Sequence, residues 1–188
     1  SNALASGDSD THRVSYTYDK MGRVVKKTNE DGSTVTYAYD KNGNVTAQTD
    51  ENGFTTRYTY NKNNQPLTVT DSMGGVTTYT YSPSTVVSSE TDALGGKTVY
   101  TYDANDNVIA VKDPEGYTTS YTYDGEERVS TVTDANGNVY RYTYDGNGNL
   151  IKVQNPDGGV ETYTYDLNDQ MTAFTDAEGN KTTYAYDE

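Results

Sequence analysis

The 188-residue sequence contains no cysteine, no tryptophan and only one histidine, His12. Without cysteine, the chain can form neither a disulfide framework nor a thiolate metal site. His12 stands in the N-terminal lead-in, and no serine lies in the sharp turn that exposes a hydrolase nucleophile. We therefore expect no catalytic residues, no specific metal site and no cofactor, and we expect a protein that is not an enzyme.

Long apolar runs and positive charge are also scarce. No run of about 18 apolar residues occurs, so no membrane insertion is expected. The 28 Asp and Glu residues outnumber the 14 Lys and Arg residues, which gives a formal net charge of -14. Because this charge repels phosphate groups, the sequence argues against nucleic acid as a partner. A cationic or neutral partner is easier to reconcile with this net charge.

Tyrosine, in contrast, is abundant and regularly spaced. Eighteen of the 20 tyrosines form Tyr-x-Tyr pairs that begin every 21 residues, and such a fixed period is typical of repeat architectures. The pairs are Tyr16 and Tyr18, Tyr37 and Tyr39, Tyr58 and Tyr60, Tyr79 and Tyr81, Tyr100 and Tyr102, Tyr121 and Tyr123, Tyr142 and Tyr144, Tyr163 and Tyr165, and Tyr184 and Tyr186.

A unit of 21 residues buries too little apolar surface to fold alone, so neighbouring units must share surface. We therefore predict one array of about eight repeats over residues 13–188. Residues 1–12 are interpreted as a tag remnant and lead-in.

Two turns recur in every unit when positions are counted from the first tyrosine of each pair. Position 17 is always glycine, and position 14 is always Asp or Asn, which predicts a type I turn followed by a left-handed residue. The position-17 glycines are Gly32, Gly53, Gly74, Gly95, Gly116, Gly137, Gly158 and Gly179.

The second turn follows the second tyrosine, as in Asp19–Gly22, and ends at position 7. Glycine is replaced there in five units, and we expect the turns that end at Thr85 and Glu127 to be irregular, because these residues tolerate the left-handed region poorly. Between the turns lie segments rich in Thr, Tyr and Val without a helical period. The fold class is therefore all-β, with tandem β-hairpins in one long antiparallel sheet that twists and coils.

The odd length of the repeat has a structural consequence. In a regular meander with three-residue loops, the tyrosines of alternate units would face opposite sides of the sheet. The other strand carries apolar residues at positions 9 and 12, such as Val108 and Val111, whose parities differ. We therefore predict one β-bulge or one even-length loop per repeat, and a bulge between these positions would place both on the tyrosine side.

The repeat unit resembles the YD repeat of RHS-repeat proteins. Tyr16–Val24 (YTYDKMGRV) and Tyr142–Leu150 (YTYDGNGNL) are the closest copies, and Thr133–Gly137 is similar to the second half of the motif. The resemblance covers about Arg13 to Glu188. Two units depart from it, because Asn61 and Ser82 replace the Asp that follows the tyrosine pair.

The resemblance implies a fold and a role. In such proteins, successive hairpins coil into a hollow shell, which bacterial RHS proteins and insecticidal toxin complexes use to enclose a toxic C-terminal polypeptide. Teneurins are similar and act in cell adhesion. The expectation is a non-catalytic structural segment of a large bacterial protein that is secreted or displayed on the cell surface, with the enclosed toxin polypeptide as its partner.

The many Asp residues and the aromatic rings suggest further sites. The Asp residues fit turn formation, and Asp145–Asn149 lacks the downstream Glu of an EF-hand calcium loop. Tyrosine rings beside Asp, Asn and Thr can stack on sugars, so a module that binds carbohydrate or the cell surface is the alternative function. The paired tyrosines are better interpreted as core, whereas Tyr117, Tyr140 and Phe54 lie outside the pairs and are candidates for an exposed glycan-binding surface.

A repeat array also has two terminal strands with unpaired backbone edges. Because all units are alike, a second copy could extend the sheet in register. We therefore expect edge-to-edge self-association that depends on concentration.

Overall fold

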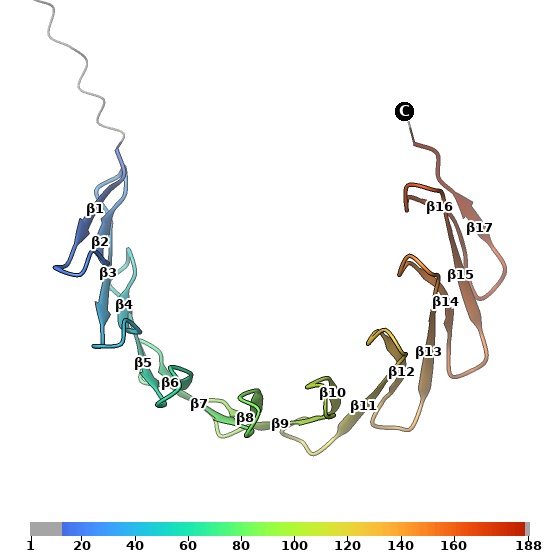
Figure 1. The fold of residues 1–188 in the computed structure, drawn as a ribbon, viewed down its shortest axis with the longest axis horizontal. Coiled ribbons are helices and arrows are strands. Elements are labelled where there is room, and N and C mark those ends of the chain that lie inside the picture. Colours follow the sequence, from blue (N-terminus) through green and yellow to red (C-terminus); the bar gives the residue numbers. More distant parts are fainter. Residues whose placement is uncertain (1–12, 187–188) are drawn as a thin grey trace, which may run out of the picture. The chain divides into compact units, whose positions relative to one another are not determined.

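The computed structural model describes residues 13–186, all of which lie in β-strands, turns or connecting segments (Figure 1). The predicted tag remnant and lead-in, with His12, lies outside these residues. None of the described segments is a helix that could cross a membrane. The strands are β1 (Ser15–Tyr18), β2 (Val24–Thr28), β3 (Thr34–Tyr39), β4 (Val45–Thr49), β5 (Thr55–Tyr60), β6 (Pro66–Thr70), β7 (Val76–Tyr81), β8 (Val87–Thr91), β9 (Lys97–Tyr102), β10 (Val108–Lys112), β11 (Thr118–Tyr123), β12 (Val129–Thr133), β13 (Val139–Tyr144), β14 (Leu150–Gln154), β15 (Val160–Tyr165), β16 (Met171–Thr175) and β17 (Lys181–Thr183).

The seventeen strands form one antiparallel sheet, which confirms the predicted all-β class. The described residues divide into two compact units, one formed by residues 13–80 with 90–95 and the other by residues 81–89 with 96–186. In the first unit, β1 to β7 pair in sequence order, from β1 with β2 to β6 with β7. In the second unit, β9 to β17 do the same. Each unit is therefore a meander of hairpins.

The predicted turns are present at both ends of the strands. All eight position-17 glycines have a positive φ, between 83° and 92°, as the left-handed corner of the turn requires. The expectation of irregular turns at Thr85 and Glu127 was wrong. Their φ angles are 74° and 60°, and their amides donate to the carbonyls of Ser82 and Asp124 at 2.9 and 3.1 Å, as in the other loops. The hydrogen bonds of the hairpin hold even these residues in the left-handed region.

The predicted bulge is present in seven hairpins of the described residues. In the hairpin of β11 and β12, Tyr123 lies opposite Val129 and Thr122 opposite Thr131, so Ser130 is the extra residue. The same register shift occurs in six further hairpins of the two units. Position 9 therefore lies opposite the second tyrosine, and position 12 opposite the first. The bulge offsets the odd repeat length, so tyrosines of successive repeats share one face.

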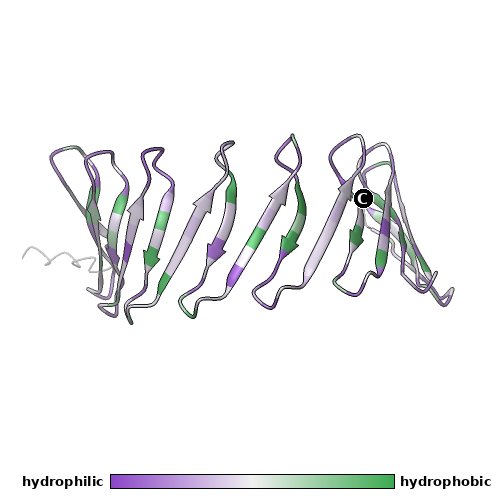
Figure 2. Cartoon of the chain, turned by 90° about the horizontal axis from the view of Figure 1, so that it is seen from below, coloured by the Kyte–Doolittle hydropathy of each residue, from purple (hydrophilic) through white to green (hydrophobic). Residues whose placement is uncertain are grey.

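Few side chains are buried, because the strands of each unit lie in a single layer. Strand contacts within the units join sequence neighbours. Among the described apolar residues, only Val35, Val153 and Ala173 are buried. The seven internal tyrosine pairs are half-buried, whereas the first and last pairs are 41 to 56% exposed. Hydrophobic residues, green in Figure 2, recur along the strands, and the loops at both edges are largely hydrophilic.

Candidate functional site

In seven of the tyrosine pairs, the second tyrosine joins its repeat to the repeat before it. The Tyr39 hydroxyl donates to the backbone carbonyl of Val24 at 2.7 Å, and the Tyr123 hydroxyl donates to that of Val108 at 2.6 Å. Each acceptor is the first residue of a strand in the preceding hairpin. The same bond is made by Tyr60, Tyr102, Tyr144, Tyr165 and Tyr186.

This bond gives a partner to a backbone carbonyl that lies outside the residues paired with the next strand. The register of β2 and β3 starts at Lys26 opposite Thr36, so the Val24 carbonyl lies beyond the paired residues. A buried or half-buried carbonyl needs a partner, and the tyrosine hydroxyl supplies one. The second tyrosine thus extends the pairing of each hairpin to its neighbour.

The first tyrosine packs against position 12 of its own hairpin. Tyr163 lies opposite Phe174, and their ring centroids are 5.2 Å apart at a tilt of 35°. On the face of the sheet that carries the tyrosines, a hollow of about 270 Å³ lies between two repeats of the second unit. The lining residues are Tyr100, Val108, Val111, Tyr121, Tyr123 and Val129. Tyrosines of successive repeats therefore meet the valines at positions 9 and 12 on one face, as the bulge requires.

Partial burial changes the ionisation of these rings. Desolvation raises the pKa of Tyr60, Tyr102 and Tyr123 above the ordinary value. The neutral hydroxyl, which is the donor in the bonds described above, is thus the form that the fold favours.

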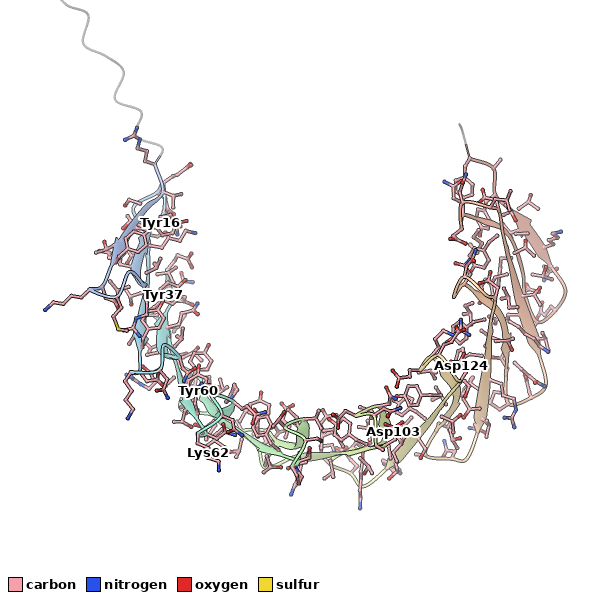
Figure 3. All side chains as sticks on the ribbon, viewed as in Figure 1. Tyr16, Tyr37, Tyr60, Lys62, Asp103 and Asp124 are labelled. Carbon is pink, nitrogen blue, oxygen red and sulfur yellow. The ribbon has the colours of Figure 1, made fainter. Side chains whose placement is uncertain are left out.

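The Asp carboxylates of the loops accept hydrogen bonds within their own turns. Asp40 accepts the backbone amides of Asn42 and Asn44 at 2.8 and 2.9 Å, and the Asn44 side chain donates to it as well. The Asn44 side chain is the main cause of the lowered pKa of the Asp40 carboxyl. Figure 3 marks Asp103 and Asp124, which begin two loops of the second unit in the same way. Among residues 13–186, no group of three or more His, Cys, Asp and Glu side chains could hold a metal ion.

Neighbouring loops are also linked to one another, which sequence reasoning missed. Asn105 donates to Glu127 of the next loop at 2.9 Å, and Asn147 donates to Asp169 at the same distance. The acceptors stand at position 7, where other repeats have glycine. The signal was present in the sequence, because a side chain that can accept a hydrogen bond replaces glycine there and a donor precedes it by 22 residues.

Two arginines at position 8 make a further link. Arg128 forms an ion pair with Asp124 at 2.8 Å, and its guanidinium donates to the Asp145 carbonyl of the next loop at 3.1 Å. The guanidinium also lies 4.7 Å from the ring centroid of Tyr144, within cation–π range. Arg23 makes the equivalent contacts in the first unit, including one with Tyr39 at 4.6 Å.

The three candidate glycan-contact residues occupy different environments. Phe54 and Tyr117 both directly follow a position-17 glycine, and they are 57% and 62% exposed. Tyr117 lines a hollow of about 500 Å³ with Asp113, Thr119 and Asp134. Tyr140 is half-buried in β13 and does not line that hollow. The structure therefore leaves Tyr117 and Phe54 accessible and places Tyr140 within the sheet.

Solved structures of similar fold come from toxin complexes. A crystal structure of TcdB2-TccC3 matches with a TM-score of 0.72 and 19% identity, over 87% of this chain and 11% of the other. A TcdB2-TccC3-Cdc42 complex gives 0.70 and 21%, over 82% and 10%. The Photorhabdus luminescens Tc holotoxin pore gives 0.66 and 16%, over 89% and 12%. This chain thus spans about a tenth of the length of those proteins, and the likeness shows a shared fold.

A model of the RHS repeat matches seven overlapping segments of the sequence. The matched residues are 22–55, 39–72, 85–116, 102–139, 128–160, 144–173 and 165–188. A comparison with curated proteins finds no match. Because the matched segments cover most of the sequence, and because the tyrosine pairs, turns and bulges recur with the same period, the chain belongs to the RHS repeat family.

Proposed function

We propose that this chain is a non-catalytic structural segment of a larger bacterial RHS protein, secreted or displayed on the cell surface, and that it forms part of a shell around a toxic C-terminal polypeptide. The observation that supports the proposal is the hydrogen bond from the second tyrosine of a repeat to the preceding repeat, as from Tyr123 to Val108. It makes successive hairpins a continuous surface.

The Asp carboxylates and the tyrosine hydroxyls, which could in principle act in catalysis, form hydrogen bonds that hold the fold together. Asp124 and Asp134 each accept two backbone amides within their own loops. The tyrosine hydroxyls are used in the same structural way. A likeness to TcdB2-TccC3 supports a shell, since that fold is shared over more than four fifths of this chain.

The test uses the full-length protein that contains this chain. A site for a specific protease is inserted into the segment C-terminal to the repeats, and its cleavage is compared in the intact protein and in the isolated segment. We expect the inserted site to be protected from cleavage in the intact protein. This protection should be lost when the repeats are unfolded with urea. Equal cleavage rates before unfolding would refute enclosure.

A glycan-binding surface is the second candidate, because Tyr117 is exposed beside two carboxylates in a hollow. A ring face flanked by acceptors can hold a sugar. The test is a glycan array followed by titration of the wild type and of Tyr117→Ala. Binding that Tyr117→Ala abolishes supports the surface, and no signal at about millimolar sugar rules it out.

Self-association of this 188-residue chain remains a prediction. The tyrosines of β1, Tyr16 and Tyr18, are 50% and 56% exposed, and Tyr184 and Tyr186 after β17 are 41% and 49% exposed. Contact between two copies would cover these rings. Sedimentation velocity should show a weight-average size that rises with concentration, and a constant monomer would contradict the prediction.

A further inference from the structure

In the second unit, the basic and the acidic strand residues lie on opposite faces of the sheet. Its strands β9 to β17 carry five cations and one carboxylate. The cations are Lys97, Lys112, Arg141, Lys152 and Lys181. The carboxylate is Glu161, which lies opposite Val153 and accepts a hydrogen bond from Tyr163, so it belongs to the tyrosine face.

The strand registers place all five cations on the other face. Directly opposed residues of antiparallel strands share a face, and so do residues two apart on one strand. Lys112 lies opposite Val99 and Thr118, and Lys152 opposite Thr143 and Thr162. Most other strand residues here are threonine, so we call this surface of β9 to β17 the threonine face. Within the described strands it carries no carboxylate.

The cations of this face are not neutralised. Arg141 and Lys152 are exposed, and neither forms an ion pair within residues 13–186, whereas Arg128 is paired in its loop. The chain has twice as many acidic as basic residues. A carboxylate-free row of cations is therefore not a result of composition, and like charges close together on a sheet are unfavourable unless an anion lies between them.

Arg141 and Lys152 are diagonal neighbours across β13 and β14. Arg141 lies opposite Gln154, and Lys152, two residues before Gln154, lies opposite Thr143. Diagonal neighbours in an antiparallel pair are about 7–8 Å apart. The strand positions of the two cations therefore have a spacing that alternate residues of an extended chain can match.

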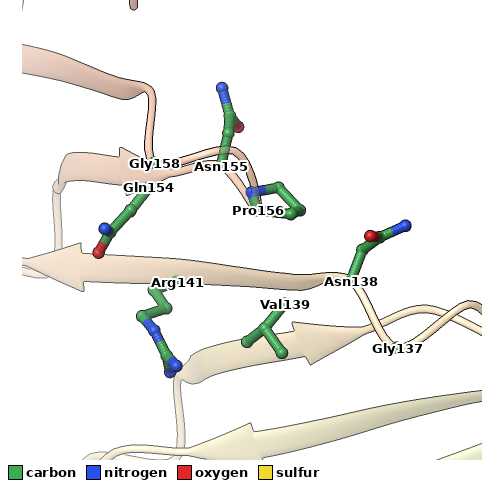
Figure 4. Close-up of a pocket in the computed structure, with 8 residues that line it drawn as sticks. All are labelled: Gly137, Asn138, Val139, Arg141, Gln154, Asn155, Pro156 and Gly158. Carbon is green, nitrogen blue, oxygen red and sulfur yellow. The ribbon is translucent and has the colours of Figure 1, made fainter.

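A hollow of about 360 Å³ adjoins Arg141 (Figure 4). No carboxylate lines it. The lining residues are Gly137, Asn138, Val139, Arg141, Gln154, Asn155, Pro156 and Gly158. In Figure 4 the Gln154 side chain reaches from β14 toward β13, which carries Arg141. Guanidinium and amide groups are the donors that bind carboxylates, and arginine does so in bidentate fashion.

We propose that the threonine face of the second unit binds an extended acidic polypeptide segment, with one carboxylate at Arg141 and another at Lys152. Side chains two apart on an extended strand lie about 6.8 Å from each other on the same side, which matches the diagonal spacing. The hydroxyls of Thr143 and Thr162 beside Lys152 add donors. This binding does not depend on whether the chain encloses a toxin.

Acidic loops favour a polypeptide over a nucleic acid. Loop carboxylates such as Asp134 and Asp157 flank the strands at the edge of the sheet. Closely spaced phosphates would meet these carboxylates, whereas separated carboxylates of a peptide can lie on the cations alone.

The test measures fluorescence anisotropy of a labelled peptide of alternating Glu and Thr, about eight residues long, with the 188-residue chain at low salt. The double variant Arg141→Gln/Lys152→Gln removes the two cations from exposed positions. Lys41→Gln/Lys62→Gln is the matched control, because it changes the net charge equally in exposed loop residues. We expect the first variant to bind about tenfold more weakly and the control to bind like the wild type.

Several results would overturn the proposal. Two of them are an absence of binding up to about 1 mM peptide and an equal loss in both double variants. Equally tight binding of a single-stranded oligonucleotide or of a Gln-Thr peptide would do the same. Circular dichroism of both variants confirms that the fold is kept. Inorganic phosphate should compete only weakly, because it can occupy one cation at a time, and strong competition would point to a simple anion site and overturn the peptide assignment.

Discussion

The hydroxyl of Tyr123 donates a 2.6 Å hydrogen bond to the backbone carbonyl of Val108, fifteen residues earlier and in the preceding repeat. The bond recurs at equivalent positions of both units, from Tyr39 to Val24 and from Tyr165 to Leu150 among others. A half-buried tyrosine thus contributes its ring to the apolar face and its hydroxyl to the backbone of a neighbour. This double use explains why the spacing of the tyrosines is the most regular feature of the sequence.

Removing one hydroxyl should weaken the array measurably. Tyr123→Phe keeps the ring but leaves the Val108 carbonyl without its donor, so the free energy of unfolding should fall by about 1 kcal/mol. Urea denaturation measures the change. Tyr117→Phe is the control, because Tyr117 is 62% exposed and outside the pairs. Equal stability of Tyr123→Phe and wild type would show that the bond contributes nothing.

The arginine at position 8 should resist even a conservative change. Arg128→Lys keeps the charge but loses the planar group that pairs with Asp124, reaches the Asp145 carbonyl and stacks on Tyr144. Thermal unfolding should show a lower Tm for Arg128→Lys. Arg57→Lys, at an exposed strand position, should leave Tm unchanged. Equal effects of the two substitutions would contradict a linking role.

Thr85 should be a site where stability can be gained. A β-branched residue at a φ of 74° is strained, and glycine adopts this conformation without a steric penalty. Thr85→Gly should raise the free energy of unfolding by about 1 kcal/mol. The reverse change at the same position of another loop, Gly43→Thr, should lower it by a similar amount, since Gly43 has a φ of 92°. Urea denaturation of both variants tests the sign.

Acid should weaken the loops through their carboxylates. The side-chain amide of Asn138 is the main cause of the lowered pKa of Asp134. Because the folded pKa lies below the unfolded value of 3.8, the stabilisation is complete above that value and is lost as the pH falls through the folded pKa. Asp134→Asn cannot titrate, so the wild type should exceed it in stability at neutral pH, and the difference should shrink on acidification below about pH 4. A difference that stays constant with pH would refute this origin.

The sequence predicted the repeat, the turns and the bulge because each is a property of one period. The opposite parities of Val108 and Val111 require a bulge between them if both are to lie on the tyrosine face, and the register of β9 and β10 contains it. The contacts between loops were not predicted. The sequence contains the donor Asn105 and the acceptor Glu127, but only the structure shows that successive hairpins bring the two side chains into contact.

Two further features were not predicted, because each depends on hydrogen bonding or pairing between strands. Thr85 was expected to disturb its turn, but the hairpin hydrogen bonds fix its backbone against its own preference. The basic threonine face became visible only with the strand registers, because Arg141 and Lys152 are eleven residues apart in sequence and neighbours across two strands.

Limited proteolysis with mass spectrometry tests the central claim most directly, namely that the tyrosine pairs join successive repeats within each unit. The 188-residue chain is treated with a protease of broad specificity under native conditions, and the fragments are followed with time. We predict that the repeats of the wild type survive as a block. In the double variant Tyr123→Phe/Tyr144→Phe, the repeats should be digested together at mild urea concentrations. A ladder of fragments that differ by 21 residues in the wild type would show that the repeats open one at a time and would contradict the account.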